Sequence, residues 1–102
     1  MRILIFFDLP VKTAAERSAA ARFRSFLLND GYHMLQYSVY ARVCNGMDAV
    51  EKHRVRVRKN IPANGSIRML TITEKQYEAI EILLGRLTEA DDPCQTEQLT
   101  IF

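Results

Sequence analysis

The chain has 102 residues, 48% of them hydrophobic and 25% charged, a balance typical of one globular domain and not of a disordered chain. Its net charge is only +2, yet residues 1–68 hold twelve Lys and Arg against five Asp and Glu, whereas residues 69–102 hold two against seven. No apolar stretch approaches the length of a membrane span, so we expect a cytoplasmic protein with no membrane partner.

The predicted elements begin with a buried strand over residues 2–7, because five consecutive apolar residues fit a strand better than a short helix. The strand ends at Asp8, whose carboxylate by itself is most simply the cap of the following turn. Residues 13–16, Thr-Ala-Ala-Glu, match a capping box that predicts the start of a helix, and Gly31 predicts its end.

Residues 32–43 alternate between apolar and polar side chains, which is typical of a half-buried strand. The two alternating sets are Leu35, Tyr37, Val39, Ala41 and Val43 on one side and Gln36, Ser38, Tyr40 and Arg42 on the other. Residues 32–35 form a short strand of their own, so the region is either a hairpin or one long bent strand.

The second half begins with residues 47–59, whose His-Arg-Val-Arg-Val-Arg run alternates like a strand but whose Val50 and Val57 keep helical spacing; we predict a helix. Residues 66–72 form a strand. Thr73-Glu-Lys-Gln76 is a second capping box, opening a helix with an apolar stripe of Tyr77, Ile80, Leu84 and Leu87. Residues 88–97 are an acidic linker, and residues 98–102 form a short final strand.

This order of elements predicts an α+β fold of one domain, residues 1–102. The first six elements form a ferredoxin-like βαββαβ unit, with an antiparallel sheet and helices on one face, followed by an extra C-terminal helix and the short strand. The first strand is apolar on both sides, so something must cover the helix-free face. A second copy of the chain is the simplest cover, and the terminal strand would pair with the edge of the partner's sheet, which predicts a symmetric homodimer.

Several motifs in this order resemble one known family, the small CRISPR-associated adaptation nucleases. These are the non-integrase subunits of the complex that captures new spacers, and the variant resembles those of single-effector (type II) systems. The motifs are Phe-Phe-Asp8-Leu-Pro at the end of the first strand, Arg17, Phe23-Arg24-Ser-Phe26-Leu27 leading to Gly31, Gln36-Tyr-Ser38-Val39-Tyr40, Pro62 with Gly65, and Ile72-Thr73-Glu74-Lys75-Gln76-Tyr77.

The resemblance implies a homodimer in which one Asp8 from each protomer holds Mg²⁺ or Mn²⁺. Two facing carboxylates and waters suit such a cation, which would activate water to hydrolyse a phosphodiester of single-stranded RNA or double-stranded DNA. Ser38, the weaker candidate, would orient the site or a phosphate. The family's agreed role is to hold duplex DNA and to bridge dimers of the CRISPR integrase subunit, so a non-catalytic DNA-binding scaffold stays an alternative.

The basic part of the chain provides candidate phosphate contacts, unless it is only a solvated surface. We favour Arg17, Arg24, Arg54 and Arg58, because each pair shares a predicted helix face. Such contacts predict binding that tolerates any base sequence and weakens steeply with salt. An RNA-recognition module would need a Gly and aromatic pattern that residues 36–43 lack, whereas a ribonuclease toxin with the same fold is harder to exclude.

Overall fold

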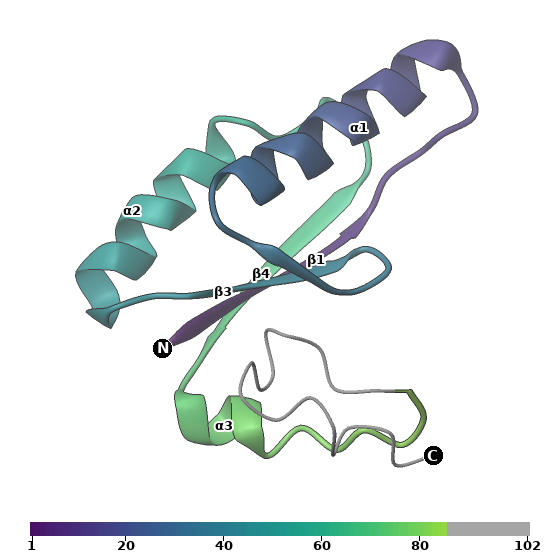
Figure 1. Ribbon diagram of the computed structural model, residues 1–102. Helices are drawn as coiled ribbons and strands as arrows, with labels where there is room; N and C mark the ends of the chain where they lie inside the picture. Colours follow the sequence, from purple (N-terminus) through teal and green to yellow (C-terminus); the bar gives the residue numbers. More distant parts are fainter. Residues whose placement is uncertain (86–102) are drawn as a thin grey trace.

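The computed structural model describes residues 1–85, which form a four-stranded antiparallel sheet with two helices on one face and a short third helix on the other (Figure 1). The elements are β1 (Arg2–Asp8), α1 (Ala14–Asn29), β2 (His33–Gln36), β3 (Val39–Val43), α2 (Gly46–Arg58), β4 (Ser66–Ile72) and α3 (Glu74–Glu78). The strand order is β2-β3-β1-β4. The predicted βαββαβ unit and extra helix are confirmed, while the acidic linker and final strand predicted at 88–102 lie outside the described residues.

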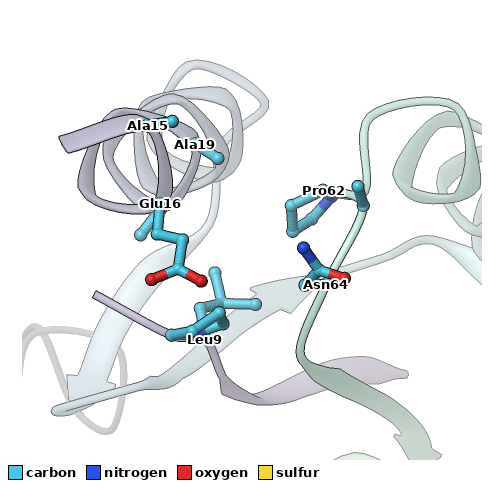
Figure 2. Close-up of a pocket in the computed structure, with 9 residues that line it drawn as sticks. Leu9, Ala15, Glu16, Ala19, Pro62 and Asn64 are labelled. Carbon is cyan, nitrogen blue, oxygen red and sulfur yellow. The ribbon is translucent and has the colours of Figure 1, made fainter. Parts of the chain in front are cut away.

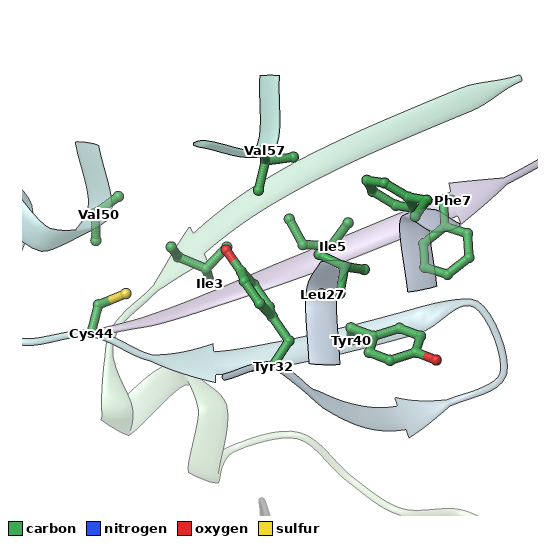
Figure 3. Packing of buried hydrophobic residues seen from close by; sticks show 10 residues of the cluster. Ile3, Ile5, Phe7, Leu27, Tyr32, Tyr40, Cys44, Val50 and Val57 are labelled. Carbon is green, nitrogen blue, oxygen red and sulfur yellow. The ribbon is translucent and has the colours of Figure 1, made fainter. Parts of the chain in front are cut away.

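The main core lies between the sheet and helices α1 and α2 (Figure 3). Ile3, Ile5 and Phe7 of β1 point into it, and the Phe7 ring meets that of Phe23 edge-on with centroids 5.3 Å apart. Because neighbouring residues of a strand point to opposite faces, the alternate residues of β1 point the other way. We call this second side, directed away from α1 and α2, the open face.

The open face is only partly covered within the chain. Tyr77 of α3 is 3% exposed and packs in a cluster with Leu4 and Ala41 at one end of the face. Beyond this cluster, Phe6 of β1 is 37% exposed, and Leu70 of β4, the register partner of Leu4, is 49% exposed. The third helix therefore covers a corner of the face that the ferredoxin-like unit leaves bare, and apolar side chains of β1 and β4 remain in contact with solvent.

Residues 32–43 form a hairpin, which decides between the two predicted alternatives. Tyr37 and Ser38 form the turn between β2 and β3, and Ser38 has a φ of 65°, in the left-handed region. The predicted alternation is wrong beyond this turn, since Tyr40 and Ala41 are both buried, at 3% and 0% exposure. Strand β3 is covered on both faces, Tyr40 contributing to the main core and Ala41 to the cluster under Tyr77.

The helices begin where the sequence predicts, but the last one ends early. Thr13 and Thr73 both cap their helices through complete capping boxes, and both ends of α2 lie one residue before the ends predicted for it. Helix α3 ends at Glu78, and Leu84 of the predicted apolar stripe is 86% exposed. An apolar stripe stabilises a helix only against a partner surface, which the described residues do not provide beyond Tyr77. No helix of residues 1–85 is long and apolar enough to cross a membrane.

Candidate functional site

Asp8 is the last residue of β1, and its side chain lies on the open face. Strand register places it opposite Ser66 of β4. The carboxylate is exposed, and it has no hydrogen-bond or ion-pair partner among residues 1–85. Carboxylate oxygens in this state are free to accept a cation, a water molecule or a protein donor. The simpler prediction, that Asp8 caps the following turn, has no hydrogen bond to support it within this part of the chain.

Gly65 fixes the backbone path beside Asp8. Its φ is +112°, and a Cβ at this position would lie 2.9 Å from the carbonyl oxygen of Asp8 and 2.7 Å from Cδ2 of Leu9. Only glycine meets both conditions, the left-handed backbone and the close approach. The loop that leads into β4 is therefore packed directly on the end of β1, which sets the position from which the carboxylate projects.

A small cavity of about 170 Å³ lies next to this end of β1, between the start of α1 and the loop before β4 (Figure 2). Its walls are mostly apolar, from residues such as Leu9 and Pro62. The carboxylate of Glu16 reaches the cavity, but its Oε1 accepts hydrogen bonds from the backbone N–H groups of Lys12 and Thr13, each at 3.0 Å. Glu16 is thus occupied in capping α1, and the cavity adds no free acid to Asp8.

Ser38 lies at the same end of the sheet as Asp8, although not on the polar side of a strand as expected. It occupies the β2–β3 turn, and its carbonyl accepts a hydrogen bond from the N–H of Phe7 at 3.1 Å. This bond anchors the turn to β1 one residue before Asp8. The structure therefore brings Ser38 and Asp8 to the same end of the sheet, and whether the serine hydroxyl acts there stays a prediction.

The four predicted phosphate contacts divide into two groups. Arg17 donates to the carbonyls of Val11 and Lys12, each at 3.2 Å, so its guanidinium supports the loop before α1. Arg54 forms an ion pair with Glu51. Arg24 and Arg58 have no hydrogen-bond or ion-pair partner within residues 1–85. All four belong to α1 or α2, on the side of the sheet opposite the open face.

A second polar cluster, centred on Asp30, is structural. The 7% exposed Asp30 is paired with Arg56, and one carboxylate oxygen lies 3.1 Å from Nδ1 of His53. Arg42 donates to the carbonyl of Asp30 at 2.6 Å. Burial, followed by the positive charges of Arg42 and Lys52, lowers the pKa of His53. These contacts join the end of α1 to α2 and β3.

The sequence alone did not identify Arg68 as a basic residue near Asp8. Arg68 lies on β4 opposite Phe6 of β1, and so on the open face. The signal was a single arginine inside the otherwise apolar and hydroxyl-bearing strand of residues 66–72. Its importance depends on strand register, which the spacing of residues within one strand does not provide.

A metal site cannot be assembled from side chains of the described residues alone. No group of three or more His, Cys, Asp and Glu side chains comes together within residues 1–85. Asp8 contributes one carboxylate per chain, and a cation held there needs further ligands from water, substrate or a second chain.

Comparison with known proteins gives one consistent result. The family model for "CRISPR associated protein Cas2" matches residues 1–80. A curated relative from Acidovorax ebreus, named "CRISPR-associated endoribonuclease Cas2", is 48% identical over 102 residues, covering 100% of both chains. A Campylobacter jejuni protein of the same name is 40% identical over 102 residues, covering 100% of this chain and 71% of the relative. The crystal structure of Streptococcus pyogenes Cas2 at pH 6.5 matches with a TM-score of 0.60 and 25% identity, covering 81% of this chain and 99% of that one.

Proposed function

The chain belongs to the Cas2 family of CRISPR-associated proteins, and from this premise we propose that it is a metal-dependent endoribonuclease that serves in spacer acquisition as a cytoplasmic homodimer. The observation that carries the proposal is the exposed, unpaired carboxylate of Asp8 at the end of β1. The curated relatives are named endoribonucleases, which favours RNA as the substrate that is cut. Family membership also disfavours the ribonuclease-toxin alternative.

The open face is the surface proposed to join the two copies. Phe6 and Leu70 lie on its central strand and on the neighbouring edge strand, and both are more than a third exposed. Burying such side chains contributes about 25 cal/mol for each Å² of apolar surface removed from water. In a symmetric pair the same patch meets itself, so a two-fold axis near the end of β1 would bring both copies of Asp8 to one place.

The donor set at this place fits Mg²⁺ or Mn²⁺ only when two chains contribute. Hard divalent cations prefer oxygen ligands, and two carboxylates with waters satisfy them better than one. A bound cation would polarise the phosphodiester and lower the pKa of a water nucleophile. The chain's own part is to hold the two carboxylates: Gly65 sets the backbone of Asp8, and Ser38 is placed where its turn could orient the site.

Duplex DNA would be held on a different surface. Arg24 and Arg58, on the helical side of the sheet, have free guanidinium groups in residues 1–85, and Arg17 and Arg54 would add weaker contacts. Phosphate contacts of this kind position a duplex without reading its sequence. The separation of these helices from Asp8 favours a second candidate function, a scaffold that holds DNA and bridges integrase dimers without cutting.

The substitution Asp8→Asn tests the proposal and separates its two parts. We expect Mg²⁺-dependent cleavage of single-stranded RNA to be lost, while duplex binding and spacer acquisition with the integrase subunit persist. Asp48→Asn, which changes an exposed acid at the start of α2, is the matched control. Cleavage that continues unchanged in the Asp8 variant would show that the assignment of Asp8 is wrong.

Mixed dimers test whether both carboxylates are needed. Unfolding and refolding equal amounts of wild-type and Asp8→Asn chains gives random pairs, about one quarter of which carry two copies of Asp8. If the site needs both carboxylates, activity falls to about one quarter of that of wild-type protein at the same total chain concentration. Retention of about half would mean that each Asp8 works alone.

A further inference from the structure

Arg68 lies one register step from Asp8 on the open face. Strand β4 places Ser66 opposite Asp8 and Arg68 opposite Phe6, so the side chains of Asp8, Ser66 and Arg68 share one face. Diagonal neighbours on adjacent antiparallel strands lie about 7–8 Å apart, and an arginine side chain spans such a gap. The guanidinium of Arg68 can therefore reach the space in front of the Asp8 carboxylate.

The charge of Arg68 is not used elsewhere in the described part of the chain. Arg68 is exposed and has no hydrogen-bond or ion-pair partner within residues 1–85. Arg2, at the opposite end of β1 on the same face, is different: it forms an ion pair with Glu74 at 2.8 Å and lies over the ring of Tyr77. Among residues 1–85, the open face thus carries one free guanidinium, that of Arg68, and it lies beside Asp8.

Resting on the proposed function, we propose that Arg68 binds a non-bridging oxygen of the phosphodiester that is cut at Asp8. A phosphodiester carries one negative charge, and the two carboxylates of a dimer repel it. A guanidinium offers a fork of N–H donors that matches two phosphate oxygens, and it offsets this repulsion. Arg68 gives and takes no proton in this role; it holds the phosphate in reach of the site.

The competing role for Arg68 is an ion pair across the dimer. If a second copy covers the open face, the guanidinium could pair with an acid of that copy and lose its access to substrate. If the second copy buries Arg68, the guanidinium needs an anion as its partner, because an unpaired arginine at an interface is costly. The two roles differ in what happens to the dimer when the charge is removed.

The experiment compares Arg68→Gln and Arg68→Lys with Arg22→Gln, all in the full-length protein. Arg22 is an exposed arginine on α1 that donates a hydrogen bond to the hydroxyl of Ser18, so its replacement removes the same charge on the other side of the sheet. Cleavage of single-stranded RNA is measured with Mg²⁺. Binding of the same RNA is measured without Mg²⁺ at several salt concentrations, and the oligomeric state by analytical ultracentrifugation.

We expect Arg68→Gln to lower kcat/KM by about 10- to 100-fold with an unchanged oligomeric state, and to reduce the salt slope of RNA binding by about one. Arg68→Lys should recover part of the kcat/KM and part of the salt slope, because a lysine keeps the positive charge but lacks the paired N–H donors of a guanidinium. A monomeric Arg68→Gln would instead assign Arg68 to the interface.

The outcomes for Arg68 and Asp8 are separable. If Asp8→Asn abolishes cleavage while Arg68→Gln equals the Arg22 control in rate and in salt slope, the inference is wrong and the proposed function stands. If Asp8→Asn cleaves normally, the proposed site itself is wrong and the role of Arg68 there fails with it.

Discussion

At the scale of single residues, Gly65 is the position where a small change should disturb the site most. Gly65→Ala puts a Cβ into contact with the Asp8 carbonyl and into a left-handed backbone. We expect the free energy of unfolding to fall by about 2–4 kcal/mol, since backbone strain of this kind alone costs about 1–3 kcal/mol. Chemical denaturation and the cleavage rate of the folded fraction are the measurements.

Gly46→Ala is the matched control for this change. Gly46 also has a positive φ, +83°, but a Cβ there would meet nothing within 4 Å. Its replacement measures the backbone strain without the steric contact. Equal losses of stability and activity in the two variants would contradict the claim that the Gly65 contact positions Asp8.

A second residue, His53, should make stability depend on pH. Its folded-state pKa is lowered, so the folded protein binds fewer protons than the unfolded chain once the pH falls below about 6.5. The free energy of unfolding is therefore not reduced by His53 above that pH. It falls as the pH drops from about 6.5 toward the pKa of His53 in the folded protein. We measure the free energy of unfolding in urea across this pH range. Its decline toward low pH should be smaller in His53→Gln than in the wild type, and the glutamine keeps an N–H donor for Asp30.

The exposed His33 provides the comparison for that measurement. His33→Gln removes a histidine without touching the Asp30 cluster, so its pH profile should follow the wild type. A wild-type profile that is flat below pH 6.5, or an unchanged decline in His53→Gln, would contradict the role assigned to His53.

At the scale of elements, the capping box of α1 should contribute more to the global stability of the protein than the capping box of α3. Thr13→Ala removes the side-chain oxygen that accepts the N–H of Glu16, and it should cost about 1 kcal/mol. Because α1 carries Phe23 and Leu27 into the main core, we expect this loss to appear in global unfolding. Thr73→Ala at the five-residue helix α3 should shift the global midpoint less.

Thr13→Ser tests whether the hydroxyl is the cause, since serine caps a helix as well as threonine does. Its unfolding midpoint, measured by circular dichroism, should match the wild type. A Thr13→Ser variant as unstable as Thr13→Ala would assign the effect to the lost methyl group and its packing.

The capping boxes also mark the limit of what the sequence predicts. Thr13 and Thr73 act on residues three positions away, so a short window of sequence contains the whole interaction. The early end of α3 and the burial of Tyr40 depend on surfaces supplied by distant elements, and no local pattern reports them. At the site, Asp8 stood out as an acid at the end of an apolar strand, whereas Arg68 became meaningful only through its register with β1.

At the scale of the whole molecule, the proposed homodimer depends on the open face. Leu70→Glu places a charge on strand β4 of this face, where a second copy would have to bury it. We expect a folded monomer, seen as a halved mass in analytical ultracentrifugation with an unchanged circular dichroism spectrum. The cleavage rate should fall as the dimer is lost, because each monomer has only one Asp8.

Leu28→Glu separates this effect from the general cost of an added charge. Leu28 is 55% exposed on α1 and Leu70 is 49% exposed on β4, so the two changes are alike except for the face they alter. The Leu28 variant should remain dimeric and active. A dimeric Leu70→Glu protein would move the interface away from the open face, and the two copies of Asp8 would then have no reason to meet.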